Sequence, residues 1–88
     1  MTTVIVKRKE NVMTELECCE IFADNLRQLM FETGYSQTDL AWDAYLDQST
    51  ISKYLKGDRL PTVKALINLC IVLDCNFNDL IPDFDYVN

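Results

Sequence analysis

Residues 34–62 read GYSQTDLAWDAYLDQSTISKYLKGDRLPT, and this stretch decides the fold. It predicts two short helices, over about residues 37–44 and 48–56, because Ser36 and Asp47 are residue types that favour the position before a helix. Apolar residues at helical spacing form the inner face of the pair: Leu40, Ala41, Ala44, Ile51 and Leu55. A link of about three residues forces the two helices to cross steeply, so the second projects from the surface.

The sequence on both sides of this pair is also helical. Before it, Thr14 and Glu17 form a capping-box pattern, and Gly34 is a typical helix end, which predicts a helix over about 15–33. After it, Thr62 caps a predicted helix over about 63–74. We expect that helix to present one apolar face: Val63, Leu66, Ile67, Leu69, Cys70 and Leu73.

A last short helix is predicted after Asn76, through Leu80 and Ile81, until Pro82 prevents its continuation. Five helices make the predicted class all-α. The length of 88 residues allows one domain. We assign it to residues 14–81, with a tail over 82–88 and an N-terminal arm or short strand over 1–13, where TTVIVKRK is β-branched and then basic.

Composition narrows the functional classes. No stretch approaches the roughly 18 apolar residues that span a bilayer, and the N-terminus lacks the apolar run of a signal peptide. We therefore expect a cytoplasmic protein with no membrane association. We expect the four cysteines to be small buried or half-buried hydrophobes without disulfides: Cys18, Cys19, Cys70 and Cys75.

No catalytic or metal-binding pattern is present in the sequence. The chain has no histidine, and the cysteine spacing matches no zinc motif. No phosphate-binding loop or nucleophile with a neighbouring base is recognisable. We therefore expect neither an enzyme nor a bound cofactor or metal.

The charge distribution is uneven. The net charge is −6, which disfavours a polyanionic partner such as DNA. Two segments are basic, however. One is Lys7, Arg8 and Lys9 near the N-terminus, and the other is residues 48–64, which contain four basic residues and one acidic residue, Asp58. Because charge acts over about 8–10 Å in salt solution, such a basic segment is compatible with specific DNA binding.

Three segments closely resemble the phage repressor and Cro-type (XRE) family: LRQLMFETGYSQTDLA at 26–41, STISKYLKGDRLPT at 49–62 and LINLCIVLDCNFNDLI at 66–81. The resemblance implies a lambda-repressor-like helix-turn-helix domain. It also implies sequence-specific binding of double-stranded DNA by a homodimer that regulates transcription as a repressor in a bacterium or phage.

The resemblance places base contacts on the predicted helix 48–56. Gln48, Ser49 and Lys53 stand at positions that face base edges in the family. A glutamine amide pairs bidentately with adenine, and lysine reaches the acceptors of guanine. Ordinary solvent-exposed polar residues would produce the same pattern, so this alternative stays open.

The resemblance also supplies phosphate contacts. Gln37 begins the first helix of the pair, where the family places a glutamine against a DNA phosphate. Thr50 is expected to pack or to touch phosphate. Lys56 and Arg59 flank the end of the second helix, where phosphate contacts are common.

The chain departs from the family pattern at several positions. Met30 and Leu55 replace a partly buried arginine–glutamate pair, and we expect their side chains to touch. Tyr45 replaces a turn glycine that usually has a positive φ, so the turn is expected to be strained or reshaped. Asp47 is interpreted as a helix cap, although a carboxylate there would repel phosphate.

Exposed aromatic residues point to a second functional class. Phe31 and Trp42 occupy positions that the family usually fills with charge, and exposed aromatics often mark a contact surface. The alternative hypothesis is therefore a protein-interaction module on a helix-turn-helix fold that has lost DNA affinity. The apolar C-terminal stretch is interpreted as the dimer contact, with the run at 4–6 as an addition: Phe77, Leu80, Ile81, Phe84, Tyr86 and Val87.

Overall fold

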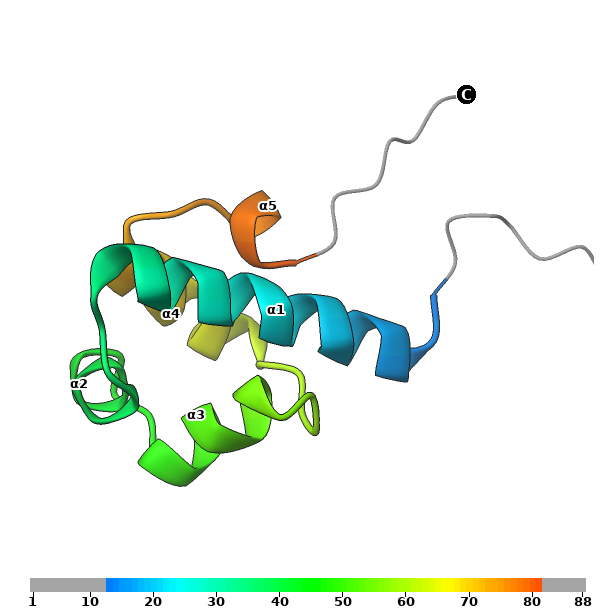
Figure 1. The fold of residues 1–88 in the computed structure, drawn as a ribbon, viewed down its shortest axis with the longest axis horizontal. Helices are drawn as coiled ribbons and strands as arrows, with labels where there is room; N and C mark the ends of the chain where they lie inside the picture. The colour runs from blue at the N-terminus through cyan, green and yellow to red at the C-terminus, as the bar shows by residue number, and fades with distance from the viewer. Residues whose placement is uncertain (1–12, 82–88) are drawn as a thin grey trace, which may run out of the picture.

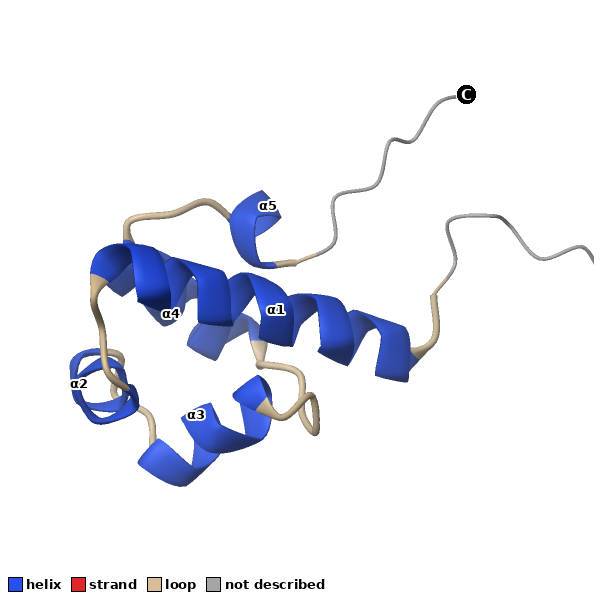
Figure 2. Ribbon diagram, viewed as in Figure 1, coloured by secondary structure: helices blue, strands red, loops and turns tan. Residues whose placement is uncertain are grey.

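The computed structural model describes residues 13–81, which fold into five helices and no strand (Figures 1 and 2). The helices are α1 (Glu15–Thr33), α2 (Gln37–Asp43), α3 (Gln48–Leu55), α4 (Val63–Leu73) and α5 (Phe77–Leu80). α1 spans the molecule, with α2 and α3 on one side of it and α5 on the other (Figure 1). The predicted all-α class is confirmed. The predicted arm and tail lie almost entirely outside the described residues.

The predicted helix ends agree with the structure to within one residue. Thr14 and Glu17 form the capping box of α1, with the Glu17 amide donating to Thr14 Oγ1 at 3.1 Å and the Thr14 amide to Glu17 Oε1 at 2.8 Å. Gly34 ends α1 with φ +79°, a conformation that glycine adopts without steric cost. The hydroxyls of Ser36 and Thr62 accept from backbone amides at the starts of α2 and α4.

The core lies where α1 meets α3, α4 and α5. Phe22 of α1 and Tyr54 of α3 pack edge to face, with ring centroids 5.3 Å apart. Six large side chains of the core are fully buried: Phe22, Leu26, Leu40, Ile51, Leu69 and Leu80. The prediction that Leu55 shares the inner face of α3 is wrong in part, because Tyr54, at i+3 from Ile51, is buried there and Leu55 is half-buried.

One face of α4 that was predicted to be apolar and inward lies in solvent. Val63 and Ile67 are 71% and 41% exposed, and Ile71 on the same face is 72% exposed. The buried face instead comprises Ala65, Leu66, Leu69, Cys70 and Leu73. α4 is apolar over most of its circumference, with Lys64 and Asn68 as its only polar residues, so its periodicity does not show which side packs.

The cysteines behave as the sequence predicts. All four are free thiols: Cys19 and Cys70 are buried, and Cys18 and Cys75 are half-buried. Burial raises the pKa of the Cys75 thiol to about 12, with the adjacent Cys70 adding to the effect. Such a thiol is a weak nucleophile, because the reactive species is the thiolate.

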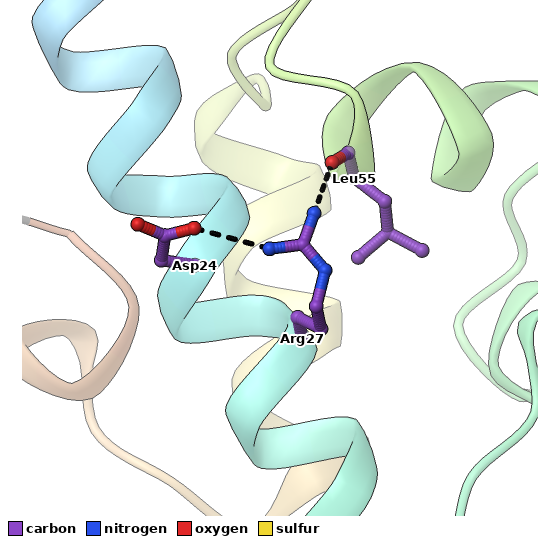
Figure 3. A network of polar contacts seen from close by, with 3 residues as sticks. All are labelled: Asp24, Arg27 and Leu55. Carbon is purple, nitrogen blue, oxygen red and sulfur yellow. Dashed lines mark hydrogen bonds and ion pairs between the residues drawn. The ribbon is translucent and has the colours of Figure 1, made fainter.

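Side chains of the two long helices bind backbone carbonyls at the ends of the three short ones. Arg27 Nη2 of α1 donates to the carbonyl of Leu55 in α3 at 2.6 Å, next to an ion pair with Asp24 at 3.0 Å (Figure 3). Asn25 Nδ2 donates to the carbonyl of Leu80 at 3.0 Å, and Asn68 Nδ2 of α4 donates to that of Ala44 at 3.2 Å. The last carbonyls of a helix find no amide partner within that helix, so these side chains bind acceptors that the short helices leave open.

The turn between α2 and α3 has a positive φ at its tyrosine. Tyr45 has φ +57° and is 90% exposed, so its side chain contributes little packing to offset the strain. The expectation of strain is confirmed, and that of a reshaped turn is not supported. A left-handed conformation costs a residue with a Cβ about 1–2 kcal/mol.

We therefore expect Tyr45→Gly to stabilise the protein. The left-handed penalty disappears, and the greater flexibility of glycine in the unfolded chain offsets part of the gain, which leaves about 0.5–1 kcal/mol in the free energy of unfolding. Urea titration followed by circular dichroism measures the change. Tyr45→Ala is the control, because it removes the ring and keeps the Cβ. Equal stability of the two variants would show that the backbone strain is not the cause.

Candidate nucleic-acid interface

α2 and α3 form a compact pair at one side of the molecule (Figure 1). Residues 44–47 connect them, and the amide of Leu46 donates to the carbonyl of Ala41 at 2.9 Å, which closes the turn. α3 packs against both α1 and α2 through Ile51 and Tyr54. Its opposite face is therefore directed away from the core.

The outward face of α3 carries most of the polar residues that the sequence singled out. Ser49, Lys53 and Lys56 recur at i, i+4 and i+7, which places them in one row, and all three are exposed. Gln48 is the first residue of α3 and is also exposed. Thr50 points more towards the protein and is half-buried, in keeping with packing or phosphate contact rather than base contact.

The remaining predicted contacts lie at the two ends of this row. Gln37 is the exposed first residue of α2, and Arg59 is exposed in the loop after α3. Within residues 13–81, neither these two side chains nor those on α3 form a hydrogen bond or ion pair with the protein. Their donors and acceptors are therefore accessible to a ligand.

Sequence reasoning missed Ser52. It follows Gln48 by one helical turn and is half-exposed, so it borders the same surface. The signal that could have found it is the i+4 spacing from Gln48. The predicted contact between Met30 and Leu55 stays a prediction: Met30 belongs to the buried core, and Leu55 packs against the edge of that core.

Asp47 does not cap α3 with its side chain, which corrects the interpretation made from the sequence. Its backbone has the dihedral angles of a cap residue, φ −75° and ψ 147°, but its carboxylate accepts no hydrogen bond from the helix amides. Asp47 is exposed at the start of α3, close in sequence to the candidate base-contacting residues. It therefore places a negative charge at the edge of the interface.

The surface beside the pair is acidic and aromatic. The hydroxyl of Tyr35 donates to Asp43 Oδ2 at 2.9 Å, and this bond to a carboxylate raises the pKa of Tyr35. Phe31 is 83% exposed and Trp42 is 81% exposed, as the sequence indicated. The described residues thus combine a basic row on α3 with an acidic, aromatic surface near α2.

Further features of residues 13–81 bear on what this part of the chain can bind. Among residues 13–81, no three histidine, cysteine, aspartate or glutamate side chains gather as they would around a metal ion. None of the five helices has the length and apolarity that crossing a membrane demands.

A shallow groove of about 280 Å³ lies between α1 and the end of α3, lined by Glu20, Asp24, Arg27 and Lys56 among others.

Comparison with known proteins finds one matching family model and several similar structures. Residues 25–84 match the family model described as a Cro/C1-type HTH DNA-binding domain. The restriction-modification controller protein C.AhdI from Aeromonas hydrophila is 29% identical, with a TM-score of 0.67 over 70% of this chain and 94% of that one. A variant of the restriction-modification controller protein C.Esp1396I is 25% identical, with a TM-score of 0.63 over 74% and 80% of the two chains.

A third similarity concerns the fold alone. The SOS-response transcriptional repressor LexA from Eubacterium rectale is 22% identical, with a TM-score of 0.70 over 82% of this chain and 81% of that one. No curated protein matches the sequence.

The two helix starts of the pair should respond differently to substitution. Ser36→Ala removes a hydroxyl that accepts from the Asp39 amide, and we expect it to lower the free energy of unfolding by about 1 kcal/mol. Asp47→Ala removes only the favourable charge at the helix start, worth no more than about 0.5 kcal/mol. Paired urea titrations measure both. A loss from Asp47→Ala as large as that from Ser36→Ala would contradict the uncapped geometry.

Proposed function

Because the chain belongs to the Cro/C1-type helix-turn-helix DNA-binding family, it is a DNA-binding regulator, and we propose that α3 enters the major groove of a specific duplex. The observation that carries this proposal is the outward row of α3, where polar and basic side chains stand free on a projecting helix. The matched family is one of DNA-binding proteins rather than of enzymes. A cytoplasmic location in a bacterium or phage host belongs to the proposal.

The proposal assigns base reading to Gln48, Ser49 and Lys53. Gln48 stands at the helix end that penetrates furthest, where its amide pairs with an adenine edge. Lys53 lies one turn after Ser49 on the same face and reaches guanine acceptors. Ser52, directly before Lys53 in α3, is an additional candidate for base contact.

Phosphate contact is assigned to the residues around this row. In this proposal Gln37 contacts a phosphate from the start of α2. Thr50, Lys56 and Arg59 contact phosphates from α3 and the loop after it. Because the chain as a whole is acidic, with a net charge of −6, non-specific affinity is expected to be low. Binding then depends on the local basic surface and on base contacts.

Base and phosphate contacts predict opposite signatures in mutants. Gln48→Ala should weaken the best duplex by about 1–3 kcal/mol and relax the preference at one position. Lys56→Ala should weaken all duplexes alike and reduce the slope of log K against log salt by about 1. Random-duplex selection followed by fluorescence anisotropy at several salt concentrations measures both. The roles assigned to both residues would be refuted if each variant bound like the unmodified protein.

A second candidate function has its own support. Phe31 and Trp42 are exposed, and Asp47 places an uncapped carboxylate at the start of α3. These observations favour a protein-interaction module with weak DNA affinity. A salt titration separates the two functions, because phosphate contact makes the affinity fall steeply with added salt, and its absence would favour the interaction module.

We further propose that the DNA-bound form is a homodimer joined near its C-terminal end. Phe77 of α5 is 43% exposed and Ile71 of α4 is 72% exposed, whereas Leu80 is fully buried in the protomer's own core. Leu80 is therefore removed from the contact that the sequence suggested, and Phe84, Tyr86 and Val87 lie outside the described residues. Two-fold pairing would set two α3 helices about 34 Å apart, one turn of DNA.

Phe77→Lys should disrupt this dimer. A charge in a symmetric apolar contact appears twice, so we expect a shift from dimer to monomer at tens-of-micromolar concentration and a steep loss of affinity for a palindromic site. Sedimentation velocity measures the shift. Val63→Lys, at the opposite end of α4, is the control and should stay dimeric. A monomeric unmodified protein that binds one half-site would refute the model.

A further inference from the structure

The carbonyls at the end of α3 are almost fully used by the chain itself. The amides of Lys56, Asp58 and Gly57 donate to the carbonyls of the three residues before Leu55, at 2.9–3.1 Å. The carbonyl of Leu55 accepts instead from Arg27 Nη2 of α1 at 2.6 Å (Figure 3). The guanidinium is also a cation at the negative end of the helix dipole. Arg27 thus joins the C-terminal end of α3 to α1.

A second side chain, on α4, joins that helix to α2. Asn68 of α4 is half-buried and donates to the carbonyl of Ala44, the residue that follows α2 and caps its C-terminal end. Ala44 itself is 1% exposed, so its carbonyl has little access to water. The two helices of the pair are therefore held from two directions, α3 by α1 and α2 by α4.

Among the described residues, no side chain of another helix bonds to the start of α3, and the Asp47 carboxylate does not bind the helix amides there. α3 has eight residues, which makes it about 12 Å long at 1.5 Å per residue. A tilt of about 10° around its C-terminal end would then move Gln48 by about 2 Å. Hydrogen bonds to base edges tolerate much smaller errors, so the attachment at Leu55, together with the buried Ile51 and Tyr54, bears on the accuracy of the reading end.

We propose that Arg27 and Asn68 are positioning residues, which set the pose of α3 and α2 for base reading without touching a base themselves. This inference rests on the proposed function. It assigns sequence discrimination in part to residues behind the interface. Neither was singled out by the sequence, because their partners are backbone atoms 28 and 24 positions away.

The test compares affinity for the selected duplex with affinity for a scrambled duplex. Arg27→Met and Asn68→Leu keep the approximate size of each side chain and remove the donors. We expect each to lower the ratio of the two affinities at least tenfold, with affinity for the scrambled duplex unchanged within about threefold. Arg27→Lys keeps the charge and one donor group, and its ratio should lie between those of Arg27→Met and the unmodified protein.

Thr14→Ala is the matched control. It removes the hydroxyl that caps the far end of α1, so it lowers stability without altering either attachment. Its affinity ratio should stay within twofold of the unmodified value at a temperature where all variants are folded. If Arg27→Met weakens both duplexes equally and flattens the salt dependence, Arg27 is a phosphate contact and the proposal is wrong. An unchanged ratio in both donor-free variants also overturns it.

Amide hydrogen exchange in the absence of DNA tests the positioning role of Arg27 and Asn68 independently of the proposed DNA-binding function. Arg27→Met should raise exchange in residues 48–55, and Asn68→Leu should raise it in residues 37–44, with α1 and α4 unchanged. If the unmodified protein selects no duplex, the proposed function fails, while this exchange pattern still tests the attachments. If Arg27→Met does not fold, the smaller increase expected for Arg27→Lys in residues 48–55 is measured instead. Exchange that rises evenly over all helices would refute a positioning role.

Discussion

The helix pair is too short to be stable without support, and this constraint governs the rest of the structure. Helices of seven and eight residues leave most of their terminal carbonyls and amides without partners in the helix, and isolated helices below about 12 residues are marginal in water. α1 and α4 supply both kinds of support. They contribute the apolar surface that buries Leu40 and Ile51, and they contribute donors from Arg27 and Asn68.

Much of the fold could be predicted from local signals. Thr14 with Glu17, Gly34, Ser36 and Thr62 mark helix boundaries through bonds to backbone groups within a few residues, so the sequence carries the whole interaction. The burial of Tyr54 and the exposure of the Val63 face of α4 were not predictable in this way. Both depend on the direction from which another helix approaches, and the amino-acid pattern of the helix itself does not contain that direction.

The candidate interface divides along the same line. The exposure of Gln48, Ser49, Lys53 and Lys56 follows from their spacing around the buried Ile51. The state of Asp47 does not follow from its residue type, because a good capping residue can still direct its carboxylate into solvent. Which of the exposed side chains meets a base depends on the partner's geometry, and one chain's sequence holds no record of that geometry.

The complete burial of Leu80 has a consequence for biosynthesis. Its helix packs on α1, and the Asn25–Leu80 bond joins residues 55 positions apart. A ribosome therefore has to release nearly all of the described chain before the last core position is filled. Until then α1 presents an open apolar surface to solvent, at the stage when a nascent chain is most exposed to aggregation and to chaperones. Folding of this domain is thus expected to be completed by its last and smallest helix.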